Sequence, residues 1–143
     1  MNELYEADIL EWSERQAALL RLAVAGTPGN ETPDWEAIIE EIESVGREQL
    51  HAVESLLAQA LAHMLKAEAW PLSHEVPQWQ ADARMFRSDA TARFTPSMRQ
   101  RLDVAKLYRR ALRYLPDTID GQLPLPIPEF CPVTLDELLN PED

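Results

Sequence analysis

Apolar residues between positions 34 and 68 recur at steps of three and four, which is the period of an α-helix and not of a β-strand. On a helical wheel, four of them lie within about 20° of Trp35: Ile42, Val53, Ala60 and Met64. A proline at position 33 and acidic residues in the first turn suit a helix start. The pattern predicts one central helix, residues 34–68, which would be about 52 Å long.

Gly46 lies inside this apolar stripe, where a glycine costs about 1 kcal/mol of helix stability relative to alanine. Two interpretations remain open. The glycine kinks or breaks the helix, or it marks a crossing point where another backbone comes close. Because a helix of this length is long for a small domain, other segments must cover both of its halves.

The same helical spacing predicts three shorter helices, at residues 5–25, 77–94 and 96–115. In the first of them, Asp8 either caps the helix or lies in its first turns. Thr95 precedes a proline, which is typical of an N-cap followed by the first helical position. The last of the three follows one apolar line: Met98, Leu102, Ala105, Leu112 and Leu115.

The C-terminal residues 116–143 are predicted to be mostly extended, because prolines recur closely along them. The apolar residues between the prolines predict that this tail lies along the bundle. Thr134 and Glu137 match a capping box and predict a short last helix. Residues 26–33 are rich in turn formers and predict a short connection.

Together these elements predict an all-α fold. We expect a four-helix bundle around one long central helix, with an extended proline-rich C-terminal tail and a short last helix. At this length the chain, residues 1–143, is expected to form a single helical domain.

The composition is that of a globular protein, because 45% of the 143 residues are hydrophobic. No apolar run approaches the length of a membrane span, and the first residues lack an apolar signal core. With Cys131 as the only cysteine, no internal disulfide can form. We therefore expect a cytoplasmic protein without membrane contact.

The net charge of −12 is distributed unevenly along the chain. Residues 1–65 carry 13 acids and 3 bases, residues 66–113 carry 5 acids and 10 bases, and residues 114–143 carry 7 acids and no base. One interpretation is that the segments pair with each other or form solvated faces. The alternative is that the basic segment binds nucleic acid, which the overall negative charge opposes.

Matching residues from position 5 to position 139 occur in an order and spacing shared with one family. The most specific are the run Glu40-Glu41-Ile42-Glu43-Ser44-Val45-Gly46-Arg47 and the pair Cys131-Pro132. The others are Tyr5, Asp8, Trp12, Gln16, Asp34, Trp35, Glu36, His63, Leu65, Lys66, Trp79, Arg84, Arg87, Pro128, Glu129, Thr134, Leu135 and Leu139. On these residues the chain resembles the bacterial family catalogued as domain of unknown function 29, with a departure at Ala67, where an aromatic residue is expected. The resemblance implies an all-α bundle and no particular activity.

Glu48 and His51 have the spacing found in carboxylate-bridged di-metal bundles. On the helical wheel, however, both lie away from the apolar stripe, and the chain contains no second pair of this kind. We therefore predict a surface pair, and we expect neither a metal site nor another cofactor.

Seven residues make up the predicted binding cluster: Asp8, Trp12, Glu41, His63, Lys66, Arg84 and Arg87. His63 lies about 80° from the centre of the apolar stripe, which suits a half-buried histidine bonded across a helix interface. It also suits a site where His63, Lys66 and an arginine of the 77–94 helix surround an anion. An ion pair of Glu41 with Arg84 or Arg87 would set packing and register.

These patterns favour an interaction module that binds another protein or a second copy of itself, because any overhang of the long helix needs a cover. The chain lacks a glycine-rich phosphate loop, a Gly-x-Ser-x-Gly motif and paired cysteines, so we do not expect an enzyme. One alternative is a small-ligand or anion-binding protein, or an enzyme, that uses the region of His63, Lys66, Glu41 and Arg84. A second alternative is a nucleic-acid-associated protein that uses the two basic helices.

Overall fold

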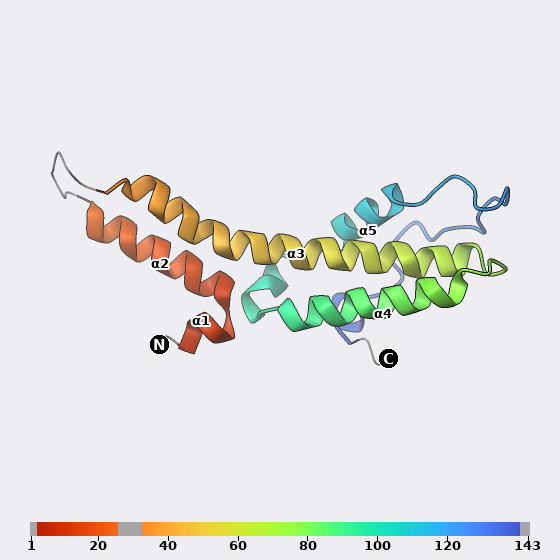
Figure 1. Ribbon diagram of the computed structural model, residues 1–143, viewed down its shortest axis with the longest axis horizontal. Helices are drawn as coiled ribbons and strands as arrows, with labels where there is room; N and C mark the ends of the chain where they lie inside the picture. Colours follow the sequence, from red (N-terminus) through yellow and green to blue (C-terminus); the bar gives the residue numbers. More distant parts are fainter. Residues whose placement is uncertain (1–2, 26–32, 141–143) are drawn as a thin grey trace. The chain divides into compact units, whose positions relative to one another are not determined.

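The computed structural model describes residues 3–25 and 33–140 of the chain (Figure 1). Its regular elements are helical, and the only β-type pairing among these residues is a single bridge between Ile119 and Gln122. The predicted all-α class is therefore confirmed. Apart from Pro33, the predicted connection at 26–33 lies outside the described residues. None of the described helices combines the length and the apolar character that crossing a bilayer requires.

The central helix α3 spans Trp35–Ala69, which confirms the long helix that the apolar spacing predicts. Asp34 begins it, because its carboxylate accepts a hydrogen bond from the Ala37 N–H at 3.2 Å. The helix continues through Gly46 without a break. A Cβ atom at Gly46 would lie 3.0 Å from Leu10 Cα and would overlap the Ser13 hydroxyl. The glycine therefore marks a close crossing of two helices.

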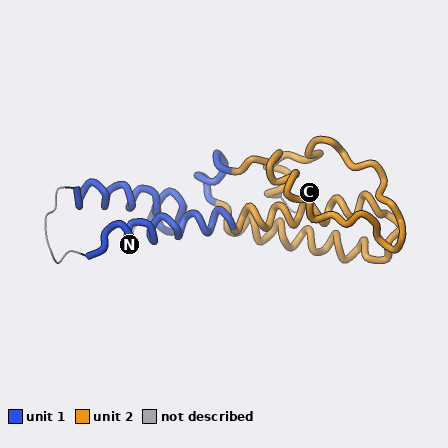
Figure 2. The backbone as a smooth tube through the Cα atoms, turned by 90° about the horizontal axis from the view of Figure 1, so that it is seen from above, with its two compact units in different colours: residues 1–51, 95–101 blue, residues 52–94, 102–143 orange. Residues whose placement is uncertain are grey.

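The chain forms two compact units, which differ in colour in Figure 2. Unit 1 comprises residues 1–51 and 95–101, and unit 2 comprises residues 52–94 and 102–143. In unit 1, α2 (Ile9–Val24) lies beside the first part of α3 (Figure 1). In unit 2, α4 (Val76–Arg93) lies beside the second part of α3 and buries Trp79, Ala83 and Ala90. The single domain expected from the chain length stays a prediction.

The helix predicted at 5–25 is wrong in one respect, because the structure divides it into α1 (Glu3–Ala7) and α2. Asp8 lies at the division and caps α2, accepting a hydrogen bond from the Glu11 N–H at 3.0 Å. An apolar line that runs across a one-residue break keeps its phase, so periodicity alone does not reveal the break. Of the two roles open to Asp8, the structure selects the cap.

The helix predicted at 96–115 is also two elements, the 3-10 helix η1 (Pro96–Gln100) and the α-helix α5 (Val104–Arg113). Asp103 starts α5, because its carboxylate accepts from the Lys106 N–H at 3.2 Å. The break changes the helical phase, so Ala105, predicted to be on the buried line, is exposed. The buried face of α5 instead carries Leu107, Tyr108 and Ala111.

The tail packs on unit 2 through Ile119 and Ile127, as its apolar residues predict, and backbone groups of the tail also attach it. The Trp70 indole N–H donates to the Gln122 carbonyl at 2.8 Å, and the Leu125 N–H donates to the Ala69 carbonyl at 2.9 Å. The Tyr108 hydroxyl donates to the Pro128 carbonyl at 2.6 Å. Three apolar side chains of the tail remain exposed: Leu123, Leu125 and Phe130.

The predicted capping box starts the last helix, α6 (Leu135–Leu138). The Thr134 hydroxyl accepts from the Glu137 N–H at 3.2 Å, and the Glu137 carboxylate accepts from the Thr134 N–H at 3.3 Å. These reciprocal bonds satisfy two N–H groups that a helix start leaves without partners. Leu138 is fully buried and holds α6 in unit 2.

Candidate functional site

The seven residues of the predicted binding cluster belong to both units. Three of them lie in unit 1: Asp8, Trp12 and Glu41. Four lie in unit 2: His63, Lys66, Arg84 and Arg87. Each set has its own surroundings.

Asp8 is a structural carboxylate in unit 1, with only 3% of the residue exposed. Besides capping α2, it accepts hydrogen bonds from the Ser97 N–H at 2.8 Å and the Ser97 hydroxyl at 2.7 Å. Burial acts to raise the pKa of Asp8, but the hydrogen bonds from Glu11 and Ser97 outweigh it and leave the pKa below its ordinary value. One carboxylate therefore caps both α2 and η1. The Thr95 side chain, which the sequence predicts as the cap of η1, makes no capping bond.

The other two members in unit 1 have packing or solvent-facing roles. Trp12 packs edge-to-face against Tyr5, with 4.9 Å between the ring centroids. Glu41 is exposed, and its carbonyl accepts the Ser44 hydroxyl at 2.8 Å. Neither side chain lines either of the two cavities described below.

Arg87 of α4 binds the C-terminal end of α6. Its guanidinium donates to the carbonyls of Leu138 at 3.1 Å, Asn140 at 2.8 Å and Glu137. Carbonyls at a helix end lack intrahelical partners, and they carry the negative end of the helix dipole. Arg87 therefore binds the tail, while Arg84 on the same helix is exposed.

We expect Arg87→Met to lower the free energy of unfolding by about 2 kcal/mol, because three carbonyls lose a charged donor. Hydrogen exchange of the α6 amides should accelerate, since the helix loses its clamp. The matched control is Arg84→Met, at an exposed position of the same helix, which should change stability by less than about 0.5 kcal/mol. Equal effects of the two substitutions would contradict the clamp.

His63 and Lys66 are brought together at a cavity of about 350 Å³ that Gln59, Ala62 and Tyr114 also line. His63 Nδ1 lies 2.8 Å from the Gln59 carbonyl, which can only accept, so Nδ1 carries a hydrogen. Its Nε2 lies 3.9 Å from an Asp82 carboxylate oxygen on α4. The histidine is half-buried, and its hydrogen bond stays within α3.

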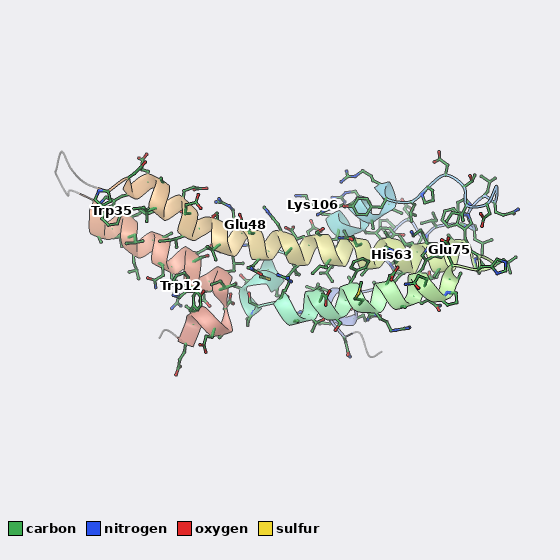
Figure 3. The ribbon with its side chains drawn as sticks, viewed as in Figure 1. Trp12, Trp35, Glu48, His63, Glu75 and Lys106 are labelled. Atoms are coloured by element: carbon green, nitrogen blue, oxygen red, sulfur yellow. The ribbon has the colours of Figure 1, made fainter. Side chains whose placement is uncertain are left out.

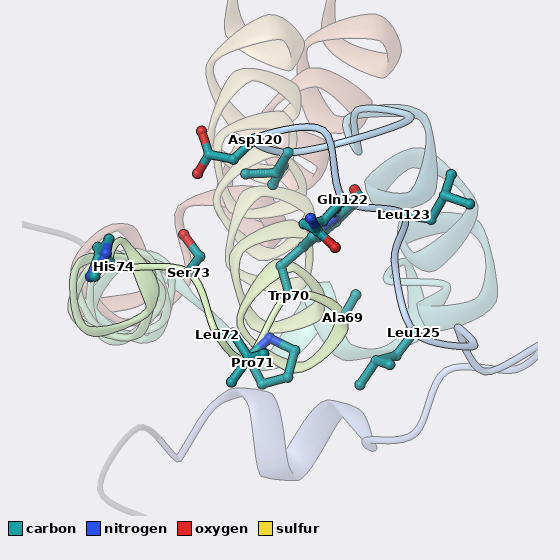
Figure 4. A pocket seen from close by; sticks show the side chains of 11 residues that line it. Ala69, Trp70, Pro71, Leu72, Ser73, His74, Asp120, Gln122, Leu123 and Leu125 are labelled. Carbon is teal, nitrogen blue, oxygen red and sulfur yellow. Dashed lines mark hydrogen bonds between the residues drawn. The ribbon is translucent and has the colours of Figure 1, made fainter.

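A second cavity, of about 520 Å³, opens at the end of unit 2 (Figure 4). We call its apolar rim the Trp70 surface: Trp70, Leu72, Leu123 and Leu125. The leucines are exposed by 95%, 77% and 52% respectively, while Trp70 is buried beneath them. No pattern in the sequence predicts this surface, although Asp120-Gly121 is a known signal for a tight turn. Both residues have positive φ, 52° and 76°, and their turn places the Gln122 carbonyl on the Trp70 indole.

Ser73, His74 and Asp120 also line this cavity, which raises the question of a catalytic triad. In the described part of the chain, no hydrogen bond or ion pair joins any two of them. The Ser73 hydroxyl instead accepts from the Glu75 N–H at 3.1 Å. A nucleophile needs a base within hydrogen-bonding reach, so this trio gives no support for such chemistry.

Glu48 and His51, which have the spacing of a metal-ligand pair, are both exposed, so their predicted surface position is confirmed (Figure 3 labels Glu48). Within residues 3–25 and 33–140, no three histidine, cysteine or acidic side chains gather closely enough to hold a metal ion.

Cys131 is half-buried, and its thiol donates to the Val133 carbonyl at 3.3 Å. Burial, with the nearby charge of Glu137, raises the pKa of this thiol, so it stays protonated at neutral pH.

The fold and these surfaces define an all-helical protein built on one long helix, with an apolar surface and a polar cavity in unit 2. The chain belongs to the family described as "Domain of unknown function DUF29", whose profile it matches over residues 4–142. It is also similar in fold to an α-helical protein of unknown function from Rhodospirillum rubrum, known from a crystal structure. That similarity has a TM-score of 0.77 at 24% identity and covers 98% of this chain and 91% of the other. No curated protein matches the chain.

Proposed function

We propose that this protein is a non-enzymatic interaction module that forms a homodimer through the Trp70 surface. The observation that carries the proposal is the exposure of Leu72, Leu123 and Leu125 around an apolar cavity. Contiguous exposed apolar side chains of this kind are typical of protein–protein contacts, whereas isolated ones are ordinary. The proposal includes a cytoplasmic location, for which the single cysteine is the support.

The same surface carries both a projection and a hollow, which supports a second copy as the partner. Leu72 is 95% exposed and therefore projects, while the cavity beside it is open over Trp70 (Figure 4). In a twofold dimer the same patch meets itself, so a projection next to a hollow is self-complementary. Leu72 of each copy would fill the cavity of the other.

The expected affinity of the dimer follows from the number of leucine side chains that it would bury. Burying a leucine side chain contributes about 1.5–3 kcal/mol, so two Leu72 side chains contribute about 3–6 kcal/mol. Association costs at least about 4 kcal/mol in lost freedom. The other two leucines of each copy must therefore also be buried, and the resulting dimer should be of micromolar strength, about −8 kcal/mol.

The test is the concentration dependence of the molar mass, measured by analytical ultracentrifugation from about 1 to 100 μM. Leu72→Glu should abolish the dimer and leave the circular dichroism spectrum unchanged, because the side chain touches little of its own chain. Leu22→Glu is the matched control, since Leu22 is 76% exposed but lies on α2 in unit 1. The control variant should dimerise like the wild type.

A wild-type protein that remains monomeric over this range would overturn the homodimer. If Leu22→Glu dissociates the dimer and Leu72→Glu does not, the contact lies on unit 1 and the Trp70 surface is not the interface. If both variants dimerise normally, neither surface carries the contact, and the proposal also fails.

A further inference from the structure

The polar cavity in unit 2 has a chemistry that the proposed dimer does not use. We infer that the cavity lined by His63, Lys66 and Tyr114 binds a phosphoryl group or an equivalent tetrahedral oxyanion. We call it the Lys66 cavity. Its volume of about 350 Å³ lies near the lower end of the range for small-molecule sites, which suits a compact ligand.

Tyr114 supplies a directed hydrogen-bond donor. The Arg110 Nε–H donates to the Tyr114 hydroxyl oxygen at 2.7 Å, and the guanidinium carbon lies 5.9 Å from the ring centroid. A phenol has one hydrogen to donate, and Arg110 occupies only an acceptor position on its oxygen. The hydroxyl hydrogen of Tyr114 is therefore left to bind an anion, and the arginine charge beside it strengthens that donor.

Lys66 supplies the positive charge. Its ammonium lies 5.2 Å from the centroid of the Trp79 ring, and Trp79 is buried. This cation–π contact holds the ammonium in place but leaves its charge uncompensated. Among the residues that the structure describes, no carboxylate lies within ion-pair distance of Lys66. A positioned ammonium without a counter-ion favours an anionic ligand.

The Asp82 carboxylate, which lies beside His63, does not compete for Lys66. Asp82 accepts a hydrogen bond from the Gln78 amide at 2.8 Å and faces His63 Nε2. Its two polar neighbours are therefore Gln78 and His63, and the charge of Lys66 stays uncompensated.

The exposed face of α5, the helix that ends at Tyr114, carries further positive charge. Lys106, Arg109 and Arg113 are exposed at spacings of three and four on that helix (Figure 3 labels Lys106). In a chain with a net charge of −12, a face of three bases without described ion-pair partners is unusual. Such a field raises the local concentration of anions and their rate of association.

Several cations stabilise a dianion more than a monoanion, so we expect a phosphoryl ligand over a single carboxylate. The probes are inorganic phosphate, sulfate and acetate, titrated into the full chain at constant ionic strength. Binding is followed by amide nuclear magnetic resonance. Shifts should concentrate at residues 59–66 and 110–114, and phosphate or sulfate should bind at least about tenfold more tightly than acetate.

Tyr114→Phe removes one donor from a partly exposed side chain and should weaken phosphate binding about tenfold. Arg110→Gln should weaken it to a similar degree, because the donor loses its charged neighbour. Arg113→Gln is the matched control: it removes one arginine from the last turn of the same helix at a position outside the cavity, and it should change affinity less than about threefold.

Three outcomes would overturn the inference. One is the absence of localised shifts up to about 50 mM phosphate, well beyond a millimolar affinity. Another is equal loss of binding in Arg110→Gln and Arg113→Gln, which would indicate general attraction to a basic face. The third is unchanged binding in Tyr114→Phe, whose helical content by circular dichroism should equal that of the wild type.

Discussion

Replacing Asp8 by alanine is expected to lower the free energy of unfolding by about 3 kcal/mol, measured by urea denaturation at pH 7. The carboxylate is buried, and it accepts three hydrogen bonds from Glu11 and Ser97. Losing an N-cap costs about 1 kcal/mol, and leaving further buried donors without a partner adds about 1–3 kcal/mol. Because Asp8 caps both α2 and η1, both elements should lose protection in hydrogen exchange.

Asp8→Asn separates the charge from the shape of this side chain. The amide keeps one acceptor oxygen, so part of the capping remains and the loss at pH 7 should be about 1–2 kcal/mol. The folded-state pKa of Asp8 lies below its unfolded value. Its charge therefore contributes stability that is fully present above the unfolded pKa and is lost as the pH falls through the folded pKa.

The stability difference between the wild type and Asp8→Asn should shrink as the pH falls below about 4. Denaturation curves at pH 7, 5, 4 and 3 would measure it. A difference that stays constant from pH 7 to pH 3 would contradict the assignment of a lowered pKa to Asp8. Asp103→Asn, at an exposed helix cap, is the control and should cost less stability at pH 7 than Asp8→Asn.

Placing a leucine at Gly46 is expected to destabilise unit 1 by about 3 kcal/mol or more, because overpacking a tight contact displaces backbone. Even the Cβ atom would lie 3.0 Å from Leu10 Cα and would overlap the Ser13 hydroxyl. The helix-propensity gain of about 1 kcal/mol on replacing glycine is too small to offset this. Glu48→Leu, which adds the same side chain at an exposed position of α3, should change stability by less than about 1 kcal/mol.

A double-mutant cycle tests the contact itself. Ser13→Ala removes the hydroxyl that a new Cβ at Gly46 would meet, at the expense of a 2.9 Å bond from that hydroxyl to the Leu10 carbonyl. Gly46→Ala should therefore be less damaging in the Ser13→Ala background than in the wild type, by about 1 kcal/mol. If Gly46→Ala stabilised the wild type, the crossing would not be as close as the structure places it.

Much of the fold follows from interactions between residues that are near neighbours in the chain. The apolar spacing around Trp35 predicts α3 to within one residue at each end. Thr134 and Glu137 predict the start of α6, because a capping box involves only residues three positions apart. The apolar spacing does not predict the break at Asp103, because the apolar residues before and after it fit one helical line.

The candidate sites depend on residues far apart in the sequence, which no local pattern pairs. Asp8 and Ser97 are separated by 89 positions, and Arg87 reaches carbonyls about 50 positions away. The sequence places His63 at the edge of the apolar stripe, and the structure leaves it half-buried beside Lys66. No arginine of α4 lines their cavity, because Arg87 binds α6, and the arginine that contacts Tyr114 is Arg110 of α5.

Periodicity and caps are set within about four residues, so the amino-acid sequence predicts α3, α4 and the start of α6, although it does not reveal the breaks at Asp8 and Asp103. Which side chains then share a cavity depends on how the helices and the tail meet. The break before α5 turns Leu107, Tyr108 and Ala111 inward, and the turn at Asp120-Gly121 brings the Gln122 carbonyl onto the Trp70 indole. The Trp70 surface and the Lys66 cavity are consequences of that packing.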